Sequence, residues 1–493
     1  MNSKPLSYDS LKTVLQHMDA HTRINLSARI PSIRKTEKSV PLKINYLTFN
    51  FDSISINDTL YKVGIFRDYG ASKPPNYVKK CNEEWGGRCD IDEYGFNDLN
   101  SLKQRSLPED IIMKPNAIEE PPPRNDDTIE QKETEIVTLK SRILELDTKY
   151  KEYLSAHGFE TIDELAEHLH TAQEQNNESR YETLYSVLDN MRSTNSSIMG
   201  NLEEIDEIQH YLECCKNFQN KTPPPYTPYI QLTVVQWKQW DLWVHEYEVE
   251  HIEHVEYRKQ LPLALRAISN FIFEGRRHPV HVETLRVGQT DIIRVPNNLQ
   301  LKVRCMHLSG SLDVVCNAIS PIIHSSSFPL KEFKIRDFSG ALENHVIDIT
   351  YLQSEMPRNA EKLDIEYYGD NDDIWLTILL ALQNKSVYLN FSVSLSADDY
   401  VELIRTWAVH GKEIGTVFTF EVLRERRTQK IVDRIAGEFE GAVKKDRCIT
   451  IPMSSHSSQI YVTTTDDFDF EFEYVRACFL EIKVVSSSDN LNQ

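Results

Sequence analysis

The chain has 493 residues, and its 75 Asp and Glu residues outnumber its 55 Lys and Arg residues, which gives a formal net charge of −20. At roughly 100–200 residues per domain this length predicts two to four domains, and the acidic balance argues against a general nucleic-acid backbone binder, which needs a basic face. No apolar run of roughly 18 residues occurs and we expect no secretory signal, so we predict no membrane association. Eight scattered cysteines are typical of a reducing compartment, and we expect a cytoplasmic or nuclear protein.

Residues 1–40 predict a compact helical arm of three short helices. Asp19 can cap the second helix, which carries Ile24 and Leu26. Pro31 stops that helix, and a third short helix is expected after it. The first helix has an apolar face with the spacing i, i+3, i+4, i+7, formed by Leu11, Val14, Leu15 and Met18.

Residues 41–118 change to a period of two, which is typical of strands. Apolar and polar residues alternate on both sides of Asn57-Asp58, and this pattern predicts a β-hairpin from Pro41 to Phe66. The segment that follows, KPPNYVKKCNEEWGGRCDIDEYGFNDL, is punctuated by glycine and proline. We predict an irregular loop there.

Residues 119–228 carry two heptad patterns between two proline triplets. The first pattern ends at His157-Gly158, and Asn195 interrupts the second at a core position. Such runs predict an antiparallel helical hairpin or a short coiled coil, which forms a semi-rigid insert. Whether this insert folds back on itself or self-associates stays open. The expected coil face is Ile136, Leu139, Ile143, Leu146, Leu184, Leu188, Met191, Ile198, Leu202 and Ile205.

Residues 229–493 alternate short strand-like segments with helical stripes. The centres of successive strand-like segments are 21, 27, 30, 26 and 29 residues apart. A strand and a helix at this spacing predict a leucine-rich-repeat-like stack within a mixed α/β (α+β) fold. The alternative is an ordinary α/β domain with parallel crossovers. The strand centres are Leu285, Met306, Phe333, Leu363, Leu389 and Phe418.

Candidate chemistry is sparse along the chain. The segment HEYEVEHIEHVEYR places His245, His251 and His254 among glutamates, and a zinc site there would require a helix. The spacing differs from His-Glu-x-x-His, so we expect a solvated or partner-facing strand instead. No phosphate-cradling loop and no nucleophile elbow occurs. We therefore predict a non-enzymatic protein with no catalytic residue, no metal and no cofactor.

The segment PLSYDSLKTVLQHMDAHTRINLSARIPSIRKTEKSVPLKIN resembles a divergent F-box. The matching features are Pro5-Leu6 at the start, Met18-Asp19 at the end of the first helix, and Arg23 in the second. The Leu-Pro order usual at the start is reversed, and the tryptophan that commonly ends an F-box is missing. The resemblance implies docking onto a Skp-type adaptor of a cullin ubiquitin ligase; the alternative is that the same face packs on the β-hairpin. The expected docking face is Leu6, Leu11, Val14, Leu15, Met18, Ile24 and Leu26.

A resemblance to the nematode F-box C family extends over four further segments. They are ISINDTLYKVGIFRDY, GGRCDIDEYGF, VEYRKQLPLALRAISNFIFEGRRHPVHVETLRV and LIRTWAVHGKEIGTVFTFEV. The resemblance implies that the domain after the F-box has no known activity of its own. We expect an F-box-type adaptor that links a target protein, which the sequence does not name, to a Skp–cullin ubiquitin ligase. The alternative is a coiled-coil scaffolding protein without a ligase role.

Overall fold

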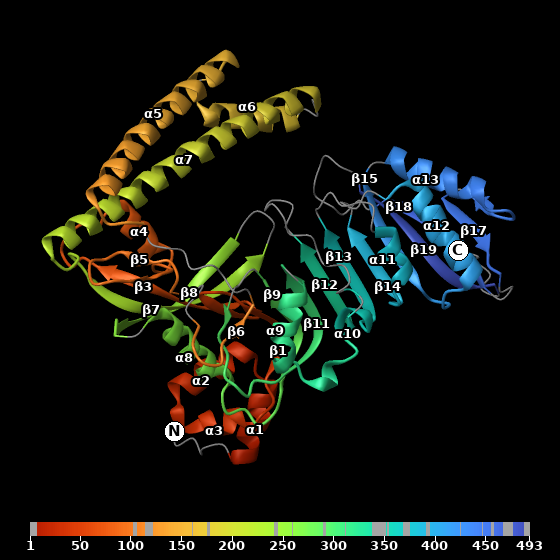
Figure 1. Cartoon of the computed structure of the whole chain (residues 1–493), viewed down its shortest axis with the longest axis horizontal. Helices are drawn as coiled ribbons and strands as arrows, with labels where there is room; N and C mark the ends of the chain where they lie inside the picture. The colour runs from red at the N-terminus through yellow and green to blue at the C-terminus, as the bar shows by residue number, and fades with distance from the viewer. Residues whose placement is uncertain are drawn as a thin grey trace.

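A computed structural model describes most of the chain. The described residues are 7–101, 106–113, 122–159, 161–174, 178–240, 245–258, 260–288, 292–310, 312–337, 352, 354–367, 375–390, 395–423, 425–445, 447–454, 458–466 and 477–487. The molecule is a mixed α/β structure around one large sheet of 15 strands, with helical segments at opposite sides of it (Figure 1). No described helix combines the length and the apolar character that a membrane crossing requires.

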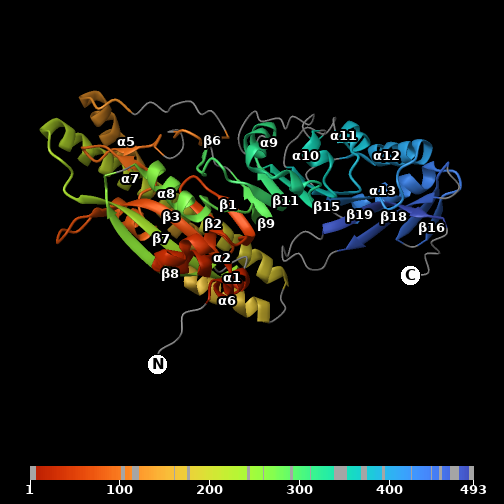
Figure 2. The ribbon, with the colours of Figure 1, turned by 90° about the horizontal axis from the view of Figure 1, so that it is seen from below.

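The centre of the sheet consists of neighbouring parallel strands. In spatial order they are β1 (Lys43–Phe49), β9 (Val280–Val287), β11 (Leu301–Ser309), β12 (Glu332–Asp337), β13 (Lys362–Tyr367), β14 (Ser386–Asn390) and β15 (Val417–Leu423). From β9 onward each strand adds one place further along the sheet, and right-handed crossovers in a constant direction leave the connecting helices on one face. Figure 2 shows these helices together on that face. They are α9 (Leu312–Ile319), α10 (Glu355–Arg358), α11 (Trp375–Ala381) and α12 (Ala397–His410).

Antiparallel strands extend the sheet at both edges. Beyond β1 lie β2 (Ser53–Ile56), β3 (Thr59–Asp68), β7 (Thr227–Trp240) and β8 (His245–Glu256). Beyond β15 lie β19 (Ala477–Ser486), β18 (Ser458–Asp466), β17 (Cys448–Pro452) and β16 (Val443–Lys445). Strands from the expected 41–118 and 229–493 regions therefore share one sheet. Helix α8 (Leu261–Phe273) precedes β9, and α13 (Glu425–Glu438) follows β15.

A row of buried side chains crosses the sheet at one level, each in register with the next. The row is Ile56, Leu47, Leu285, Met306, Phe333, Leu363, Val387, Phe418, Ile482, Val462 and Ile449, none more than 1% exposed. Burying one such side chain contributes about 1.5–3 kcal/mol, so this row anchors the core. The predicted strand centres lie in this row except Leu389, which is two residues further along β14 than Val387.

The predicted β-hairpin at the start of the sheet is a three-stranded meander. Its Asn57-Asp58 turn is confirmed, and Asn57 has a φ of 53°, a left-handed conformation that asparagine tolerates. A second tight turn, in which the Asn50 N–H donates to the Ser53 carbonyl at 2.9 Å, divides the first alternating run into β1 and β2.

The expected irregular loop after β3 contains α4 (Asn76–Glu83). The prolines before it indicate a loop in the sequence, but Pro75 lies at the N-cap of α4, where its missing N–H costs nothing. The short strands of the loops are β4 (Asp90–Ile91), β5 (Asn97–Asp98), β6 (Ile111–Ile112) and β10 (Ile292–Ile293).

The arm contains the short helices that the sequence predicts. They are α1 (Tyr8–His17), α2 (Ala20–Arg29) and α3 (Arg34–Lys38), with a 3-10 turn η1 (Pro31–Ile33) between the last two. The Asp19 carboxylate caps α2 by accepting the Thr22 N–H at 2.9 Å, as predicted. Pro31 follows the end of α2 and begins the 3-10 turn.

The heptad segment folds back on itself as a helical hairpin. Its helices are α5 (Asp126–Ala156), α6 (Ile162–Glu174) and α7 (Glu178–Asn220). Ile136 shares a buried cluster with Ile205, and Leu154 shares another with Met191, so α5 and α7 run antiparallel. The predicted break at Gly158 is followed by an additional helix, α6, which packs on α7.

The register of the predicted coil face changes along α7. Leu202 was placed on this face, but it is 42% exposed, whereas Ile208 is buried in the seam. Asn195, expected at a core position, is also exposed. An α-helix drifts by about 20° per heptad against a strict seven-residue repeat. Over the 43 residues of α7 this drift moves the seam off the predicted positions.

Candidate functional site

One face of the central sheet carries polar side chains, and no connecting helix among the described residues lies on it. On β12, Phe333 and Ile335 are buried toward the helices, and Glu332, Lys334 and Arg336 alternate with them on the opposite side. The same alternation holds along β13, β14 and β15, because successive side chains of a strand point to opposite faces. We call this polar side of β1, β9 and β11 to β15 the open face.

The middle of the open face is neutralised by ion pairs between neighbouring strands. The Lys334 ammonium lies 3.3 Å from the Asp364 carboxylate and 2.5 Å from the Glu366 carboxylate. Arg336 Nε lies 2.9 Å from Glu366. Burial raises the pKa of Asp364 despite the two lysines that lower it. This part of the open face therefore has little free charge for a partner.

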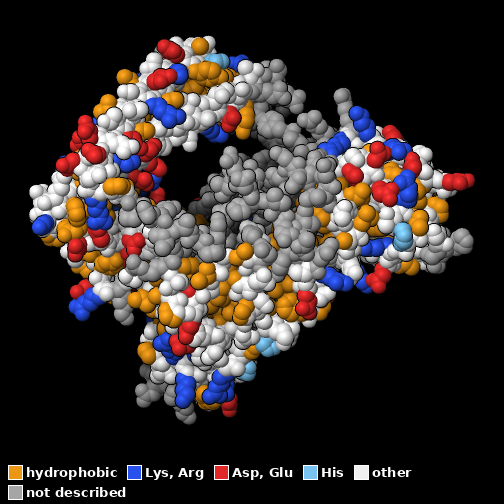
Figure 3. Space-filling model, in the orientation of Figure 1, with side chains coloured by type: hydrophobic (Ala, Val, Ile, Leu, Met, Phe, Trp, Pro, Cys, Tyr) orange, Lys and Arg blue, Asp and Glu red, His pale blue; other side chains and the backbone are white. Residues whose placement is uncertain are grey.

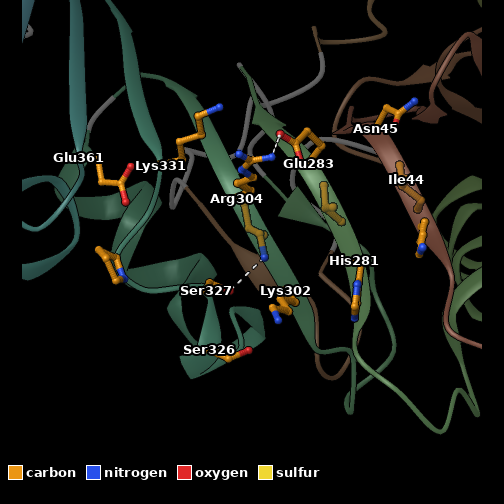
Figure 4. Close-up of a pocket in the computed structure, with 14 residues that line it drawn as sticks. Ile44, Asn45, His281, Glu283, Lys302, Arg304, Ser326, Ser327, Lys331 and Glu361 are labelled. Atoms are coloured by element: carbon orange, nitrogen blue, oxygen red, sulfur yellow. Dashed lines mark hydrogen bonds and ion pairs between the residues drawn. The ribbon is translucent and has the colours of Figure 1, made fainter. Parts of the chain in front are cut away.

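The beginning of β1, β9 and β11 differs, because basic side chains gather there around a hollow of about 500 Å³ (Figure 4). Lys43, His281 and Lys302 are paired in register across the three strands. Registered neighbours in a parallel sheet share a face and lie about 4.8 Å apart. We call this site the basic hollow. Its charged lining residues are Lys43, His281, Glu283, Lys302, Arg304, Lys331 and Glu361.

The charges around the basic hollow are not balanced in pairs. Arg304 Nη1 lies 3.0 Å from the Glu283 carboxylate, and this pair is exposed at the rim. Within the described part of the chain, no carboxylate comes within 4 Å of Lys43 or Lys302. Burial lowers the pKa of His281, and the neighbouring Lys302 and Lys43 lower it further. His281 is thus held neutral between two cations.

An irregular step in the strands coincides with the basic hollow. The buried apolar residues in the middle of β9 are Val282 and then Leu285, three positions apart instead of two. The matching steps are Ile44 to Leu47 on β1 and Val303 to Met306 on β11. The pairing of β1 with β9 and of β9 with β11 keeps the same offset on both sides of this step, so the step occurs at one level in all three strands. The repeated spacing of three was visible in the sequence, but its meaning depends on the pairing of strands far apart in the chain.

The arm is fastened to the body by buried charges. The Glu37 carboxylate, 1% exposed, accepts from Arg23 Nη2 at 2.9 Å and from Arg276 Nη1 at 3.0 Å. Arg23 also donates to the Pro41 carbonyl at 2.7 Å. Glu37 and Arg23 belong to the arm, whereas Arg276 follows α8. The carboxylate therefore joins the arm to the body, a partnership that the sequence did not indicate.

The structure separates the predicted docking residues by exposure. Leu15 is fully buried and Ile24 lies in the main core, so both hold the arm together. Val14 is 39% exposed. The half-buried members of the face are Leu11, Met18 and Leu26. Leu6 lies outside the described residues.

The predicted coil-face residues hold the helical hairpin together, apart from Leu202. Its buried members are Ile136, Leu139, Leu184, Leu188, Met191 and Ile205. Ile143, Leu146 and Ile198 are half-buried.

The histidine-rich segment forms the exposed edge strand β8. His254 forms a hydrogen bond with Gln231 Oε1 at 2.9 Å and stacks on Phe66. His251 lies beside Glu253 at 3.6 Å. Within the described ranges no three His, Cys, Asp or Glu side chains are grouped to hold a metal ion.

Comparison with known proteins gives one partial match. Residues 260–424 match the model of a family described as a domain of unknown function (DUF3557). The match begins with α8 and ends in β15, so it contains the parallel strands from β9 onward and their helices. A search of curated proteins and a search of solved structures found no match.

Proposed function

We propose that this chain is a non-enzymatic recognition adaptor that links a target protein to a Skp–cullin ubiquitin ligase. In this proposal the arm docks on the Skp-type adaptor and the open face holds the target. The observation that carries it is the buried Glu37 linkage, which fixes the arm to a sheet with an uncovered polar face. Two contact surfaces on one frame are what an adaptor requires.

The layout of the sheet supports the recognition half of the proposal. Consecutive parallel strands that advance in one direction, with helices on one face, are the arrangement of a leucine-rich-repeat-like stack. Such stacks present their helix-free face to partners. We therefore interpret β9 to β15 as a leucine-rich-repeat-like stack whose open face binds the target.

The exposure of the arm decides which residue can test docking. Leu15 is buried inside the arm, so a change there would disturb the arm itself. Val14 is exposed on the same helix, next to the half-buried Leu11 and Met18. Apolar docking would cover these three side chains, and burial of apolar surface contributes about 25 cal/mol per Å².

The test is a pulldown of a Skp-type adaptor by the full-length protein and by its Val14→Asp variant. We expect the wild type to bind and the variant to lose binding, since burying a lone carboxylate in an apolar interface costs several kcal/mol. Val409→Asp is the matched control, because Val409 is 60% exposed on α12, outside the arm. Circular dichroism checks the fold of each variant. Equal binding by Val14→Asp and wild type, or no binding by the wild type, would falsify the proposal.

A second candidate function, self-associating scaffold, is favoured by one surface of the helical hairpin. In an antiparallel helix pair, the residues that directly follow the seam on each helix lie on the same side. Exposed apolar residues occupy these positions, and Figure 3 shows hydrophobic side chains at the surface of the hairpin. They are Val137, Leu144, Met199 and Leu202.

Light scattering of the full-length protein tests this second function. Self-association would give a mass that rises with concentration, and Leu144→Lys would keep the protein monomeric by placing a charge in the apolar contact. Thr138→Lys adds the same charge at an exposed position of α5 that lies off the stripe of Val137 and Leu144, and it should leave the mass unchanged. A wild type that stays monomeric at every concentration would exclude the scaffold.

A further inference from the structure

The basic hollow holds two lysines on either side of a neutral histidine, and among the described residues no carboxylate pairs with either lysine. Lys43 and Lys302 flank His281 in register, each about one strand spacing away. Lys43 and Lys302 are therefore like charges on the same face, about two strand spacings apart, and they repel each other. The chain as a whole carries a net charge of −20, so acidic residues are abundant, yet none of the carboxylates that the structure describes pairs with Lys43 or Lys302. An arrangement that costs stability in the free protein is expected where a ligand supplies the missing charge.

The lining of the basic hollow favours an anion over a cation. Its four permanent cations, Lys43, Lys302, Arg304 and Lys331, face two carboxylates, Glu283 and Glu361, so the lining has a net charge of +2 with His281 neutral. Glu283 is engaged by Arg304 at 3.0 Å, which leaves the lysines available. Flexible ammonium groups bind phosphate as point charges.

The number and placement of the donors point to a single oxyanion with several oxygens. The two lysine side chains can converge from both sides on a group above His281, and Figure 4 shows His281 and Lys302 side by side on neighbouring strands. Ser326 and Ser327 line the same hollow, and Ser327 Oγ is fixed by the Val303 N–H at 3.0 Å. A phosphate monoester offers a charge of about −1.5 to −2 and three acceptor oxygens.

We propose that the basic hollow binds a phosphate monoester dianion through Lys43, His281 and Lys302. The hollow is open to solvent and its volume of about 500 Å³ exceeds that of a phosphate group. The ester therefore carries a further group, either a peptide chain or a small organic molecule, which lies against the neighbouring part of the open face. This inference stands on the basic hollow alone and does not depend on docking by the arm.

The experiment measures binding of three probes to the full-length protein by isothermal titration calorimetry at constant ionic strength. The probes are a phosphoserine-containing heptapeptide, glucose 6-phosphate and inorganic phosphate, each compared with acetate. We expect at least one phosphate ester to bind more tightly than acetate. The peptide and the sugar phosphate distinguish the two sources of the ester. If none of the three phosphate probes binds, or acetate binds equally well, the proposal is overturned.

Variants of the two lysines locate the binding to the basic hollow. Lys43 and Lys302 are exposed, so alanine at both positions should leave the fold intact while lowering phosphate-ester affinity by roughly tenfold or more. Lys302→Arg keeps the charge and should retain most of the binding. The matched control is Lys140→Ala with Lys216→Ala, which removes the same charge from exposed positions of the helical hairpin. Unchanged affinity in the Lys43→Ala, Lys302→Ala double variant would overturn the assignment. Val14→Asp must bind the ester as the wild type does.

Discussion

The arm and the helical hairpin are both helical segments attached to the same sheet, but different forces attach them. The arm is joined to the body by a carboxylate between two guanidinium groups, Glu37 with Arg23 and Arg276. The helical hairpin is joined by aromatic contacts and by more exposed ion pairs: His210 of α7 stacks on Tyr77 of α4 with ring centroids 4.9 Å apart, and Glu203 of α7 pairs with Lys80 of α4. Figure 1 shows the two attachments on opposite sides of the sheet.

At the base of the helical hairpin, the surroundings of His210 disfavour its protonated form. Burial and, to a smaller extent, the buried guanidinium of Arg67 lower the pKa of His210 to about 3. Nearby, the Arg124 guanidinium lies over the Phe96 ring at 4.0 Å. The attachment of the arm thus depends on the charge of Glu37, whereas the attachment of the helical hairpin depends on His210 remaining uncharged. Neutralising Glu37 should therefore weaken the attachment of the arm, and protonating His210 in acid should destabilise the helical hairpin.

Glu37→Gln should break the attachment of the arm and have the largest effect. The substitution keeps the shape of the side chain but leaves Arg23 and Arg276 buried without a counter-charge. Breaking a buried ion pair from one side costs about 3–5 kcal/mol. Urea unfolding measures the loss, and hydrogen exchange in α1 to α3 shows whether the arm opens first.

Glu413→Gln is the control for that prediction. Glu413 pairs with Lys385 at 3.0 Å, and both side chains are largely exposed. An exposed pair contributes about 0–1 kcal/mol, so this variant should unfold close to the wild type. A Glu37→Gln variant as stable as Glu413→Gln would contradict the role assigned to the buried linkage.

The strands of the body could be predicted because each carries its own signal. The alternation around Phe333 or Leu363 requires only that one face be buried, and the cap at Asp19 is a local hydrogen bond. Leu389, the predicted centre of its strand, is buried in β14, but Val387 takes the place in the row that crosses the sheet. Both residues are apolar and buried, so the local pattern does not indicate which of them pairs with Leu363.

The basic hollow and the Glu37 linkage could not be predicted, because they join residues that are far apart in the chain. Lys43 becomes a neighbour of His281 only through the pairing of β1 with β9. Arg276 likewise contacts Glu37 although it follows the helical hairpin in the sequence. The prediction that Leu202 lies in the seam was wrong for a different reason. The heptad rule assumes a strict seven-residue repeat, which a long straight helix does not keep.

Acid should loosen the helical hairpin through His210. Its pKa is about 3 in the folded protein and about 6.5 when unfolded, so below pH 6.5 the unfolded state binds the additional proton. Stability is therefore full above pH 6.5 and falls as the pH drops toward 3. At pH 5 the loss from this group is about 2 kcal/mol relative to pH 7.5.

The variant His210→Phe isolates that contribution, because phenylalanine can stack on Tyr77 and cannot take up a proton. Urea unfolding at pH 7.5 and pH 5 should show a smaller loss in the variant than in the wild type, by about 2 kcal/mol. His157→Phe is the control, since His157 is exposed on the same helical hairpin, and it should keep the acid sensitivity of the wild type. If His210→Phe and His157→Phe lose equal stability at pH 5, the buried histidine is not the group that distinguishes the helical hairpin from the arm.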